Sequence, residues 1–525
     1  MRPIPSLMRT DQQIPRAADW LARRASLSPE RVALIDVRDG RRITYRQWDT
    51  VVNRTAHFLA AGLKVSKGDR VAVLASNCVA YLDIWFACNK TGAILQNLNW
   101  RLSSRELDAL IADASPGVLF YTADFAETVT TLRSMDGCAS IRHWVALDDA
   151  DPAADRCLSE RDVHETTAPP DPGLDQDDPW VICYTGGTTG LPKGVVLTHG
   201  NITWNAVNTV MSWEINAGDT AILNAPLFHT GALNVFTAPL VQAGGASVVC
   251  PGFDADQVFD LVESGTANLF FGVPTMFSLL QNHRRWEQAD FSALKLVISG
   301  GAPCPRPLFE RFWARGVDFK TGYGLTEAGP NTFWLPPEQV RAKPGAVGYP
   351  LFHVEVRLRD EAGDPIEVPG KTGEVLIRGP HRTPGYWNNA EATAAAIDAD
   401  GWLHTGDLAM FDDDGAYTIV GRSKDMYISG GENVYPAEVE SVIHGHSAIA
   451  EAAVFGVADA TWGETGCAAV VLKPGQALSA AELRAWLKER IAGYKVPRRV
   501  YFLDELPKTG AGKLDKRAIR KKFKA

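Results

Sequence analysis

A loop rich in glycine and threonine is the part of this sequence best suited to chemistry. It reads Tyr184-Thr185-Gly186-Gly187-Thr188-Thr189-Gly190-Leu191-Pro192-Lys193-Gly194. Glycines let backbone N–H groups approach an anion closely, the threonine hydroxyls add donors, and Lys193 adds a positive charge. This combination favours a polyphosphate ligand over a plain glycine-rich hairpin. It differs from a Walker A loop, because no Lys-Ser/Thr pair follows the glycines and residues 195–197 are predicted to form a strand.

Four further segments hold carboxylate, aromatic, guanidinium and lysine side chains beside glycine turns. In chain order they are Tyr323-Gly324-Leu325-Thr326-Glu327, Gly401-Trp402-Leu403-His404-Thr405-Gly406-Asp407, Gly421-Arg422-Ser423-Lys424-Asp425 and Pro507-Lys508-Thr509-Gly510-Ala511-Gly512-Lys513. With the glycine loop, these motifs resemble those of the AMP-forming acyl-adenylate superfamily, which includes acyl-CoA synthetases, amino-acid adenylation domains and beetle luciferases. The resemblance covers nearly the whole chain.

The resemblance implies a two-step reaction with ATP, Mg²⁺ and coenzyme A. A carboxylic acid, fatty or aryl, would be joined to AMP with release of pyrophosphate, and the acyl group would then pass to coenzyme A. Such a site must supply cations and oriented donors where negative charge gathers. Two alternatives stay open: an acyl-adenylate donor that loads a phosphopantetheinylated carrier protein, and a ligand-sensing relative that has lost catalysis.

The resemblance also assigns roles to individual residues. Lys513 matches the family's catalytic lysine, which bridges the attacking carboxylate and the α-phosphate. Glu327 matches its Mg²⁺ ligand, since a carboxylate oxygen suits that metal. Thr326 is the expected phosphate contact beside Glu327, and Lys193 the expected phosphate contact of the glycine loop.

A second group of residues is predicted to bind the nucleotide and coenzyme A. Tyr323 would stack on adenine, Asp407 would accept the two ribose hydroxyls, and Arg422 would contact the nucleotide beside it. The remaining members of this group are the loop residues Thr185, Gly186, Gly187, Thr188, Thr189 and Gly190, the adenine-pocket segment Gly301, Ala302 and Pro303, and Gly430 and Gly431, which would line a pantetheine tunnel.

The acyl pocket is less well defined by the sequence. His229 lies in a segment that resembles acyl-CoA synthetases, and no Asp stands near it to pair with the ammonium of an amino acid. Small residues that would leave room for a chain or a ring are Gly300, Gly322, Gly324 and Gly329. A medium-chain or aryl carboxylate is the favoured substrate.

Composition sets wider limits. The chain has 525 residues, with 53 Lys+Arg against 62 Asp+Glu and a net charge of −9. This acidic balance argues against a nucleic-acid partner, although basic residues cluster at the C-terminus. No apolar run approaches the roughly 18 residues that span a bilayer, and no apolar leader opens the chain. The eight cysteines include no Cys-x-x-Cys pair. We therefore expect free thiols and a cytoplasmic enzyme without integral membrane association; a homodimer is left open.

These residues must be positioned by more than one domain, because single cores stop growing at about 250–300 residues. Alternating helices and apolar strands predict an α/β fold with helix-covered parallel sheets, and short strands from Val354 onward predict a small β-barrel. The predicted organisation is a large N-terminal domain over 1–421, a hinge over 422–425 and a small α/β domain over 426–525. The family resemblance implies that the small domain is mobile and that Lys424 is its hinge residue. Residues 149–178 are interpreted as a surface linker.

Local signals also predict two helices in the C-terminal part. Pro436 can begin the first of them. Ser479-Ala480-Ala481-Glu482 is a capping-box pattern that can begin the second, and Gly493 is predicted to end it.

Overall fold

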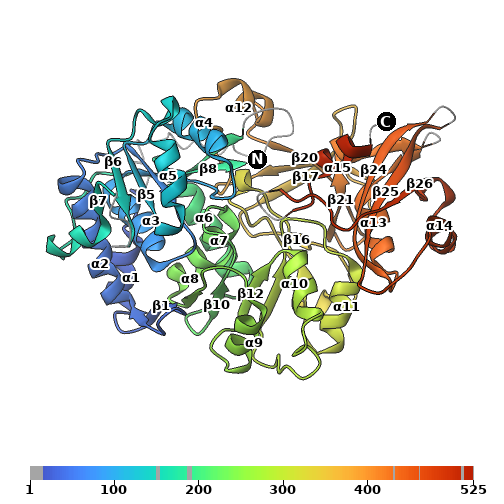
Figure 1. Cartoon of the computed structure of the whole chain (residues 1–525), viewed down its shortest axis with the longest axis horizontal. Coiled ribbons are helices and arrows are strands. Elements are labelled where there is room, and N and C mark those ends of the chain that lie inside the picture. The colour runs from blue at the N-terminus through green and yellow to red at the C-terminus, as the bar shows by residue number, and fades with distance from the viewer. Residues whose placement is uncertain are drawn as a thin grey trace, which may run out of the picture.

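The computed structural model describes residues 16–148, 154–185, 192–429, 432–459, 462–509 and 513–523. Two sheets of seven strands form the N-terminal part, at the left and centre of Figure 1. The first has the order β7-β6-β5-β3-β4-β8-β9 and is parallel except for the antiparallel pair β8 and β9. Its strands are β3 (Arg70–Leu74), β4 (Ile94–Asn97), β5 (Val118–Tyr121), β6 (His143–Ala146), β7 (Arg156–Cys157), β8 (Pro179–Thr185) and β9 (Lys193–Thr198).

The second sheet has the order β14-β13-β12-β10-β11-β1-β2 and is parallel except for β1 and β2. Because the carboxyl ends of parallel strands meet at one edge, the turns after β12, β13 and β14 lie together there. The strands are β1 (Val32–Asp36), β2 (Arg42–Thr44), β10 (Thr220–Leu223), β11 (Ala246–Val249), β12 (Leu269–Gly272), β13 (Leu296–Ser299) and β14 (Lys320–Thr321).

Helices bury the faces of both sheets. One core holds side chains from both sheets together with Trp48, Trp85 and Ile202 of the helices between them. Separate cores lie under α4 and α5 on the first sheet and under α9, α10 and α11 on the second. The helices are α1 (Trp20–Leu27), α2 (Tyr45–His57), α3 (Val79–Thr91), α4 (Ser104–Ala114), α5 (Ala126–Leu132), α6 (His199–Ser212), α7 (Thr230–Ala232), α8 (Ala238–Ala243), α9 (Ala255–Glu263), α10 (Pro274–Gln281), α11 (Arg306–Ala314) and α12 (Ala390–Ala396).

An antiparallel module occupies the place of the predicted small barrel. Its strand order is β18-β17-β19-β20-β21, and Gly348, beside the pair β15 and β16, bridges to Tyr417 of β21. The strands are β15 (Phe333–Trp334), β16 (Tyr349–Pro350), β17 (Glu355–Arg359), β18 (Pro365–Ile366), β19 (Gly373–Arg378), β20 (Leu403–Phe411) and β21 (Tyr417–Arg422). Its buried face packs against Leu269, Leu296 and Ile298 of the second sheet, so the module is firmly attached to the N-terminal part.

The C-terminal part has its own sheet and forms a separate lobe at the right of Figure 1. The strands are β22 (Tyr427–Ser429), β23 (Glu432–Val434), β24 (Ile449–Asp459), β25 (Gly463–Leu472) and β26 (Arg499–Phe502), with helices α13 (Pro436–His444), α14 (Ala480–Lys488) and α15 (Lys516–Phe523). Pro436 stands in the first turn of α13, and Ser479 and Glu482 form the predicted capping box. Helix α14 ends at Lys488, before Gly493, so the predicted end of that helix is wrong. The exact boundary at 422–425 stays a prediction.

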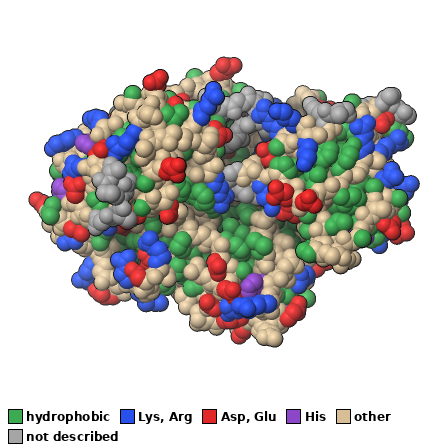
Figure 2. All heavy atoms as spheres, in the orientation of Figure 1, with side chains coloured by type: hydrophobic (Ala, Val, Ile, Leu, Met, Phe, Trp, Pro, Cys, Tyr) green, Lys and Arg blue, Asp and Glu red, His purple; other side chains and the backbone are tan. Residues whose placement is uncertain are grey.

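Two members of the C-terminal basic cluster approach carboxylates, one in the lobe and one in the connecting segment. Lys516 Nζ lies 2.6 Å from Glu440 Oε1, and Arg520 approaches the Asp425 carboxylate at 3.8 Å. Other Lys and Arg side chains gather on the surface of this lobe, at the right of Figure 2. Arg520 thus ties α15 to the segment that joins the two lobes.

The prediction of a surface linker over 149–178 is wrong for residues 156–163, whereas residues 164–178 contain no helix or strand and lie mostly at the surface. Strand β7 adds to the edge of the first sheet, and Arg161, three residues beyond Leu158, reaches into the core. Its Nη1 lies 2.8 Å from Oδ2 of Asp83, whose side chain is 1% exposed. The buried charge of Asp83 requires this partner, so the polar stretch completes the packing around α3.

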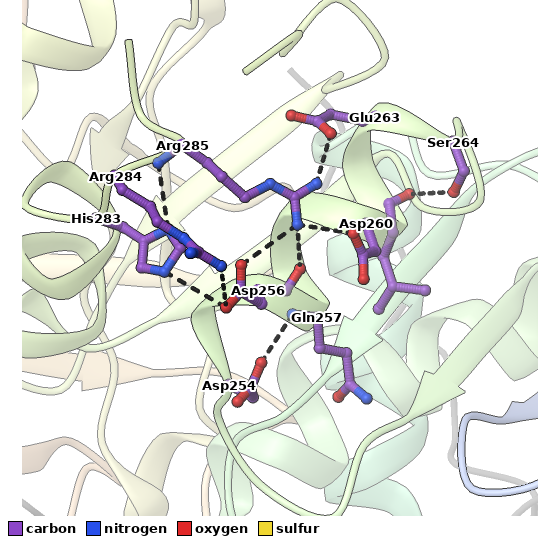
Figure 3. Close-up of polar contacts among 10 residues, drawn as sticks. Asp254, Asp256, Gln257, Asp260, Glu263, Ser264, His283, Arg284 and Arg285 are labelled. Carbon is purple, nitrogen blue, oxygen red and sulfur yellow. Dashed lines mark hydrogen bonds and ion pairs between the residues drawn. The ribbon is translucent and has the colours of Figure 1, made fainter. Parts of the chain in front are cut away.

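An ion network fastens α9 to the turn after α10 (Figure 3). Arg285 Nη1 lies 2.7 Å from Asp260 Oδ1 and its Nη2 lies 2.6 Å from Glu263 Oε2. His283 Nε2 approaches Asp256 at 3.6 Å on the same face. These contacts fix the far end of α10, whose near end follows the strand β12 at the site described below. No helix in the described ranges has the length and apolar character to span a bilayer.

Candidate active site

Lys193 and Glu327 meet through one aromatic side chain. Lys193 opens β9, paired with Thr185 at the end of β8, so both residues flank the glycine loop. The Lys193 ammonium lies 5.0 Å from the ring centre of Tyr386, whose hydroxyl donates to Glu327 Oε1 at 2.9 Å. The predicted loop residues Gly186, Gly187, Thr188, Thr189 and Gly190 lie outside the described residues, as do Gly430 and Gly431.

Thr326 and Glu327 lie in a single 3₁₀ turn (Thr326–Ala328). The Glu327 carbonyl accepts a hydrogen bond from the Thr383 N–H at 2.8 Å. The backbone of the turn is therefore held by the same segment that carries Tyr386, and the carboxylate contacts the Tyr386 hydroxyl.

Asp407 is the centre of a second cluster. Its Oδ1 lies 2.8 Å from Arg422 Nε, and its Oδ2 accepts a hydrogen bond from the Tyr323 hydroxyl at 2.7 Å. Asp407 and Arg422 stand opposite each other on β20 and β21. Burial and the Asp407 carboxylate raise the pKa of Tyr323, so the phenol stays a donor. Each carboxylate oxygen can accept a further hydrogen bond, which leaves capacity for a diol.

Lys513 reaches this region from the C-terminal lobe. Its backbone carbonyl accepts a hydrogen bond from the Thr509 N–H at 2.7 Å. The next residue, Leu514, forms an antiparallel backbone bridge with Lys508. Desolvation of the Lys513 ammonium by neighbouring side chains and the nearby Arg422 charge lower its pKa, although the residue as a whole is exposed; Asp407 acts in the opposite direction. The side chain ends against Gly301, the residue after Gly300 at the end of β13; Ala302 and Pro303 follow, before α11. The structure thus brings together Lys513, Gly301, Asp407 and Arg422.

His229 lies just before α7 and is half-buried, with its Nε2 atom shielded from solvent. Burial, with the nearby charges of Lys513 and Arg101, lowers the pKa of His229 to about 3. The ring is therefore neutral at physiological pH, and it can take part only as a neutral wall or hydrogen-bonding group.

The interpretation of the predicted pocket glycines needs correction. A Cβ at Gly324 would stand 2.0 Å from the Pro330 carbonyl oxygen, and one at Gly329 would stand 3.0 Å from the His381 carbonyl oxygen. At Gly322 the Ile298 side chain fills the space at 2.8 Å. These three glycines permit close packing of the protein, and the prediction that they leave room for substrate is wrong.

Gly300 differs, because its neighbour is the aromatic ring of Phe271 at the end of β12. A Cβ there would stand 2.8 Å from Phe271 Cε2, and a Cβ at Gly231 would stand 3.2 Å from Phe271 Cε1. The Phe271 ring thus lies between Gly231 and Gly300. It also lines a hollow of about 10 Å³ with Ala221, Leu223, Ala225, Ala232 and Phe236.

Sequence reasoning missed Phe271 and Tyr386. Phe271 belongs to the apolar run of β12, and nothing in the sequence separates it from ordinary core residues. Tyr386 follows Gly385 in an irregular segment, where a single aromatic residue carries no distinctive spacing.

Comparison with known proteins decides the family. The sequence profile of the AMP-binding enzymes matches residues 21–387, and that of the AMP-binding enzyme C-terminal domain matches residues 438–513. The chain belongs to the AMP-binding enzyme family. It is 42% identical over 505 residues to a feruloyl-CoA synthase from an Amycolatopsis species, covering 96% of this chain and 98% of the relative. It is 38% identical over 507 residues to the indoleacetate–CoA ligase of Aromatoleum aromaticum, covering 96% and 97%.

A solved structure supports the same placement. The anthranilate CoA ligase AuaEII in complex with anthranoyl-AMP superposes with a TM-score of 0.89 at 29% identity, covering 97% of both chains. This AMP-binding enzyme is an AMP-forming acyl-CoA synthetase of the acyl-adenylate superfamily. It activates a carboxylic acid with ATP to acyl-AMP, releasing pyrophosphate, and transfers the acyl group to coenzyme A.

Proposed function

We propose that the acid is an aryl carboxylate and that the clusters around Glu327, Asp407 and Lys513 bind its adenylation partners. The observation that carries the acid class is the aromatic wall formed by Phe271 between Gly231 and Gly300. A rigid ring limits the depth available to a long alkyl chain, and the small hollow beyond it is bordered by packed side chains. The names of the relatives, which refer to ferulate, indoleacetate and anthranilate, support the same class.

The roles proposed for the residues follow from charge and reach. Lys193 and Lys513 supply positive charge on two sides of the nucleotide's phosphates, Lys513 at the α-phosphate where the acid's carboxylate attacks. Asp407 receives the ribose hydroxyls, and the Tyr323 ring offers a face to adenine. Thr326 adds a hydroxyl donor to the phosphates.

The residues around Glu327 fit a magnesium ion. Glu327 offers a carboxylate with Oε1 already held by Tyr386, while Oε2 has no hydrogen-bond partner among the described residues and is available to a metal. Mg²⁺ in nucleotide sites commonly takes one or two protein carboxylates and completes its shell with phosphates and water. When bound, Mg²⁺ supplies charge neutralisation at the phosphate oxygens. Glu327 would hold the ion, and Lys193 would orient the phosphates beside it.

The second step requires another arrangement of the lobes. The contact of Lys513 with Gly301 supports an arrangement of the C-terminal lobe that serves adenylation. We propose that this lobe, from about residue 426, turns about 422–425 to withdraw Lys513 and to bring the segment around Gly430 and Gly431 to the pantetheine arm. Keeping both steps at one site protects the reactive acyl-AMP from water.

Cysteine chemistry supports a cytoplasmic location. All eight cysteines are free thiols, and Cys88, Cys183 and Cys467 are among the buried ones. Free thiols are typical of a reducing compartment. The homodimer stays a prediction.

A pyrophosphate-release screen tests the proposed acid. Aryl-acrylic, arylacetic and benzoic acids would be compared with fatty acids of increasing length, each with ATP, Mg²⁺ and coenzyme A. We expect kcat/KM to be at least about tenfold higher for the best aryl acid than for any fatty acid, because pocket shape discriminates by that order. A fatty acid as the best substrate would contradict the aryl assignment. Replacing coenzyme A by holo-carrier proteins in the same assay tests the carrier-loading alternative.

A further inference from the structure

We infer that Tyr386 is a positioning residue for the magnesium–nucleotide subsite: its hydroxyl fixes the Glu327 carboxylate, and its ring face holds the Lys193 ammonium. The inference rests on the roles proposed above for Glu327 and Lys193. Tyr386 contacts these two residues through different parts of one side chain, the phenolic oxygen at 2.9 Å from Glu327 Oε1 and the ring centre at 5.0 Å from Lys193 Nζ.

The hydroxyl group selects which carboxylate oxygen remains available. A phenol is protonated at neutral pH and donates its one hydrogen to Oε1. Oε2 is then the oxygen open to a metal, and the carboxylate cannot rotate freely about its last bond. Hydrogen-bonded partners of metal-binding carboxylates orient them, and removal of such a partner typically weakens metal binding by 10- to 100-fold.

The ring has a separate effect on Lys193. An ammonium over an aromatic face is attracted by the ring's electron density, without the strong pairing that a carboxylate would give. The tyrosine therefore stands between a cation and an anion that would otherwise be drawn together. Kept apart, Lys193 remains free to meet phosphate oxygens and Glu327 remains free to meet the metal.

Tyr386 can serve this purpose because its backbone is anchored on three sides. Its N–H donates to the Thr393 hydroxyl at 2.9 Å. The neighbouring Trp387 N–H donates to the Gly194 carbonyl at 2.7 Å, and the Gly385 carbonyl accepts from the Val196 N–H at 3.1 Å. The segment is thus bound directly to the strand that leaves the phosphate loop, so the position of the phenol follows that strand.

The test measures binding, so it does not depend on turnover. The probe is α,β-methylene-ATP, titrated calorimetrically into the full chain with excess Mg²⁺ and again with EDTA. For Tyr386→Phe, which keeps the ring and removes the hydroxyl, we expect about tenfold weaker binding with Mg²⁺ and less than about threefold change with EDTA. For Tyr386→Leu, which removes both, we expect weaker binding under both conditions. Unchanged or tighter binding of Tyr386→Phe with Mg²⁺ would overturn the inference.

Two further variants separate the possible failures. The control variant Tyr349→Phe removes a comparable half-buried hydroxyl, which lies outside the site and donates to Gln339 Oε1 at a distance of 2.8 Å. This variant should bind the nucleotide analogue like the wild type. Glu327→Gln should lose the magnesium dependence. If Glu327→Gln retains it, the role proposed for Glu327 fails; if Glu327→Gln loses it while Tyr386→Phe does not, only the inference about Tyr386 fails.

Folding is checked by the thermal midpoint of each variant. Should Tyr386→Phe not fold, Tyr386→Gln replaces it, since the amide can still donate to Glu327 although the ring is gone. We expect Tyr386→Gln to keep its preference for the magnesium complex within about threefold and to bind the free nucleotide more weakly. Loss of that preference in a folded Tyr386→Gln would overturn the inference.

Discussion

Lys513 of the C-terminal lobe ends directly against Gly301 of the N-terminal part. A Cβ at Gly301 would lie 3.5 Å from Lys513 Nζ and 3.3 Å from its Cε. Gly301 also has a φ of +77°, a left-handed conformation that side chains other than glycine's adopt at a cost. Because Gly301 has no side chain, it can adopt the left-handed conformation of the turn after β13, and it also leaves room for the Lys513 side chain.

Replacement of this lysine should separate the two steps of the reaction. Lys513→Ala removes the ammonium that we propose stabilises charge between the carboxylate and the α-phosphate, so adenylation should fall by about 100-fold or more. Thioester formation from supplied acyl-AMP should change less than about threefold, because the proposed rotation of the lobe withdraws the lysine before that step. Single-turnover assays of each step measure both effects, and an equal loss in the two would contradict the role of Lys513.

The pH profile of adenylation should show the altered ammonium. The pKa of Lys513 is lowered from its ordinary value of 10.5 by desolvation and by Arg422. A lowered pKa means that the charge is lost at a lower pH, so kcat/KM for ATP, which reports the free enzyme, should decline on a basic limb below pH 10.5. Lys513→Arg, whose guanidinium stays protonated, should lack that limb in whatever activity it retains. An identical limb in Lys513→Arg would assign it to another group.

Elements of the fold that depend on residues close together in the chain could be predicted from the sequence. The strand after the glycine loop, the proline start of α13 and the capping box of α14 depend on neighbours within a few residues. The motifs around Glu327, Asp407 and Lys513 were recognisable for the same reason, and the structure brings Asp407 and Lys513 toward one region although they are far apart in the chain.

Features that depend on distant packing could not be predicted. The burial of Arg161 against Asp83 is invisible in a polar stretch, because nothing local identifies its partner. From the sequence, the small size of Gly324 is expected to leave room for substrate, yet the Pro330 carbonyl oxygen lies where a side chain at Gly324 would stand. Tyr386 has no local signature, because its partners Lys193 and Glu327 come from other segments.

Restriction of the connecting segment should impair the second step. Lys424 lies in a 3₁₀ turn (Ser423–Asp425) between β21 and β22. Lys424→Pro fixes φ there and disfavours helical backbone at Ser423, so rotation of the lobe should be hindered. We expect thioester formation from acyl-AMP to fall by about tenfold or more while adenylation changes little. Lys424→Ala, which leaves the backbone free, is the control; unaltered thioester formation in Lys424→Pro would argue against rotation at this residue.

Stability should decrease in acid through a buried histidine. His381 is fully buried, and burial lowers its pKa to about 4. The His381 side chain binds a proton near pH 6.5 in the unfolded chain but only near pH 4 in the folded chain. The contribution of the neutral side chain to the free energy of unfolding is therefore complete above pH 6.5 and is lost as the pH falls toward 4. The total for this shift is about 3 kcal/mol. His381→Phe cannot titrate, so its thermal midpoint should fall less between pH 6.5 and 4; parallel curves for wild type and variant would show that His381 contributes nothing to the dependence.

Phe271 should set the length of acid that the enzyme accepts. Its ring separates the hollow near Ala221 and Ala232 from the turn at Gly300 and Gly301, where Lys513 ends. Phe271→Ala would enlarge the hollow toward that turn and remove the flat ring face that a planar acid can contact. We therefore expect kcat/KM for aryl acids to fall by about tenfold and that for medium-chain fatty acids to rise, reversing or narrowing the preference.

This role of Phe271 is supported only if its substitution alters the recognition of the acid and leaves the binding of ATP unchanged. Phe271→Leu keeps most of the side-chain volume, so it should still exclude long acids while losing the aromatic contact with aryl acids. The KM for ATP should stay within about twofold of the wild-type value in both variants. Loss of a large buried ring also lowers stability, so the comparison is made well below the thermal midpoint of each variant. If Phe271→Ala and the wild type rank the acids identically, the wall that limits the substrate must be formed by other residues.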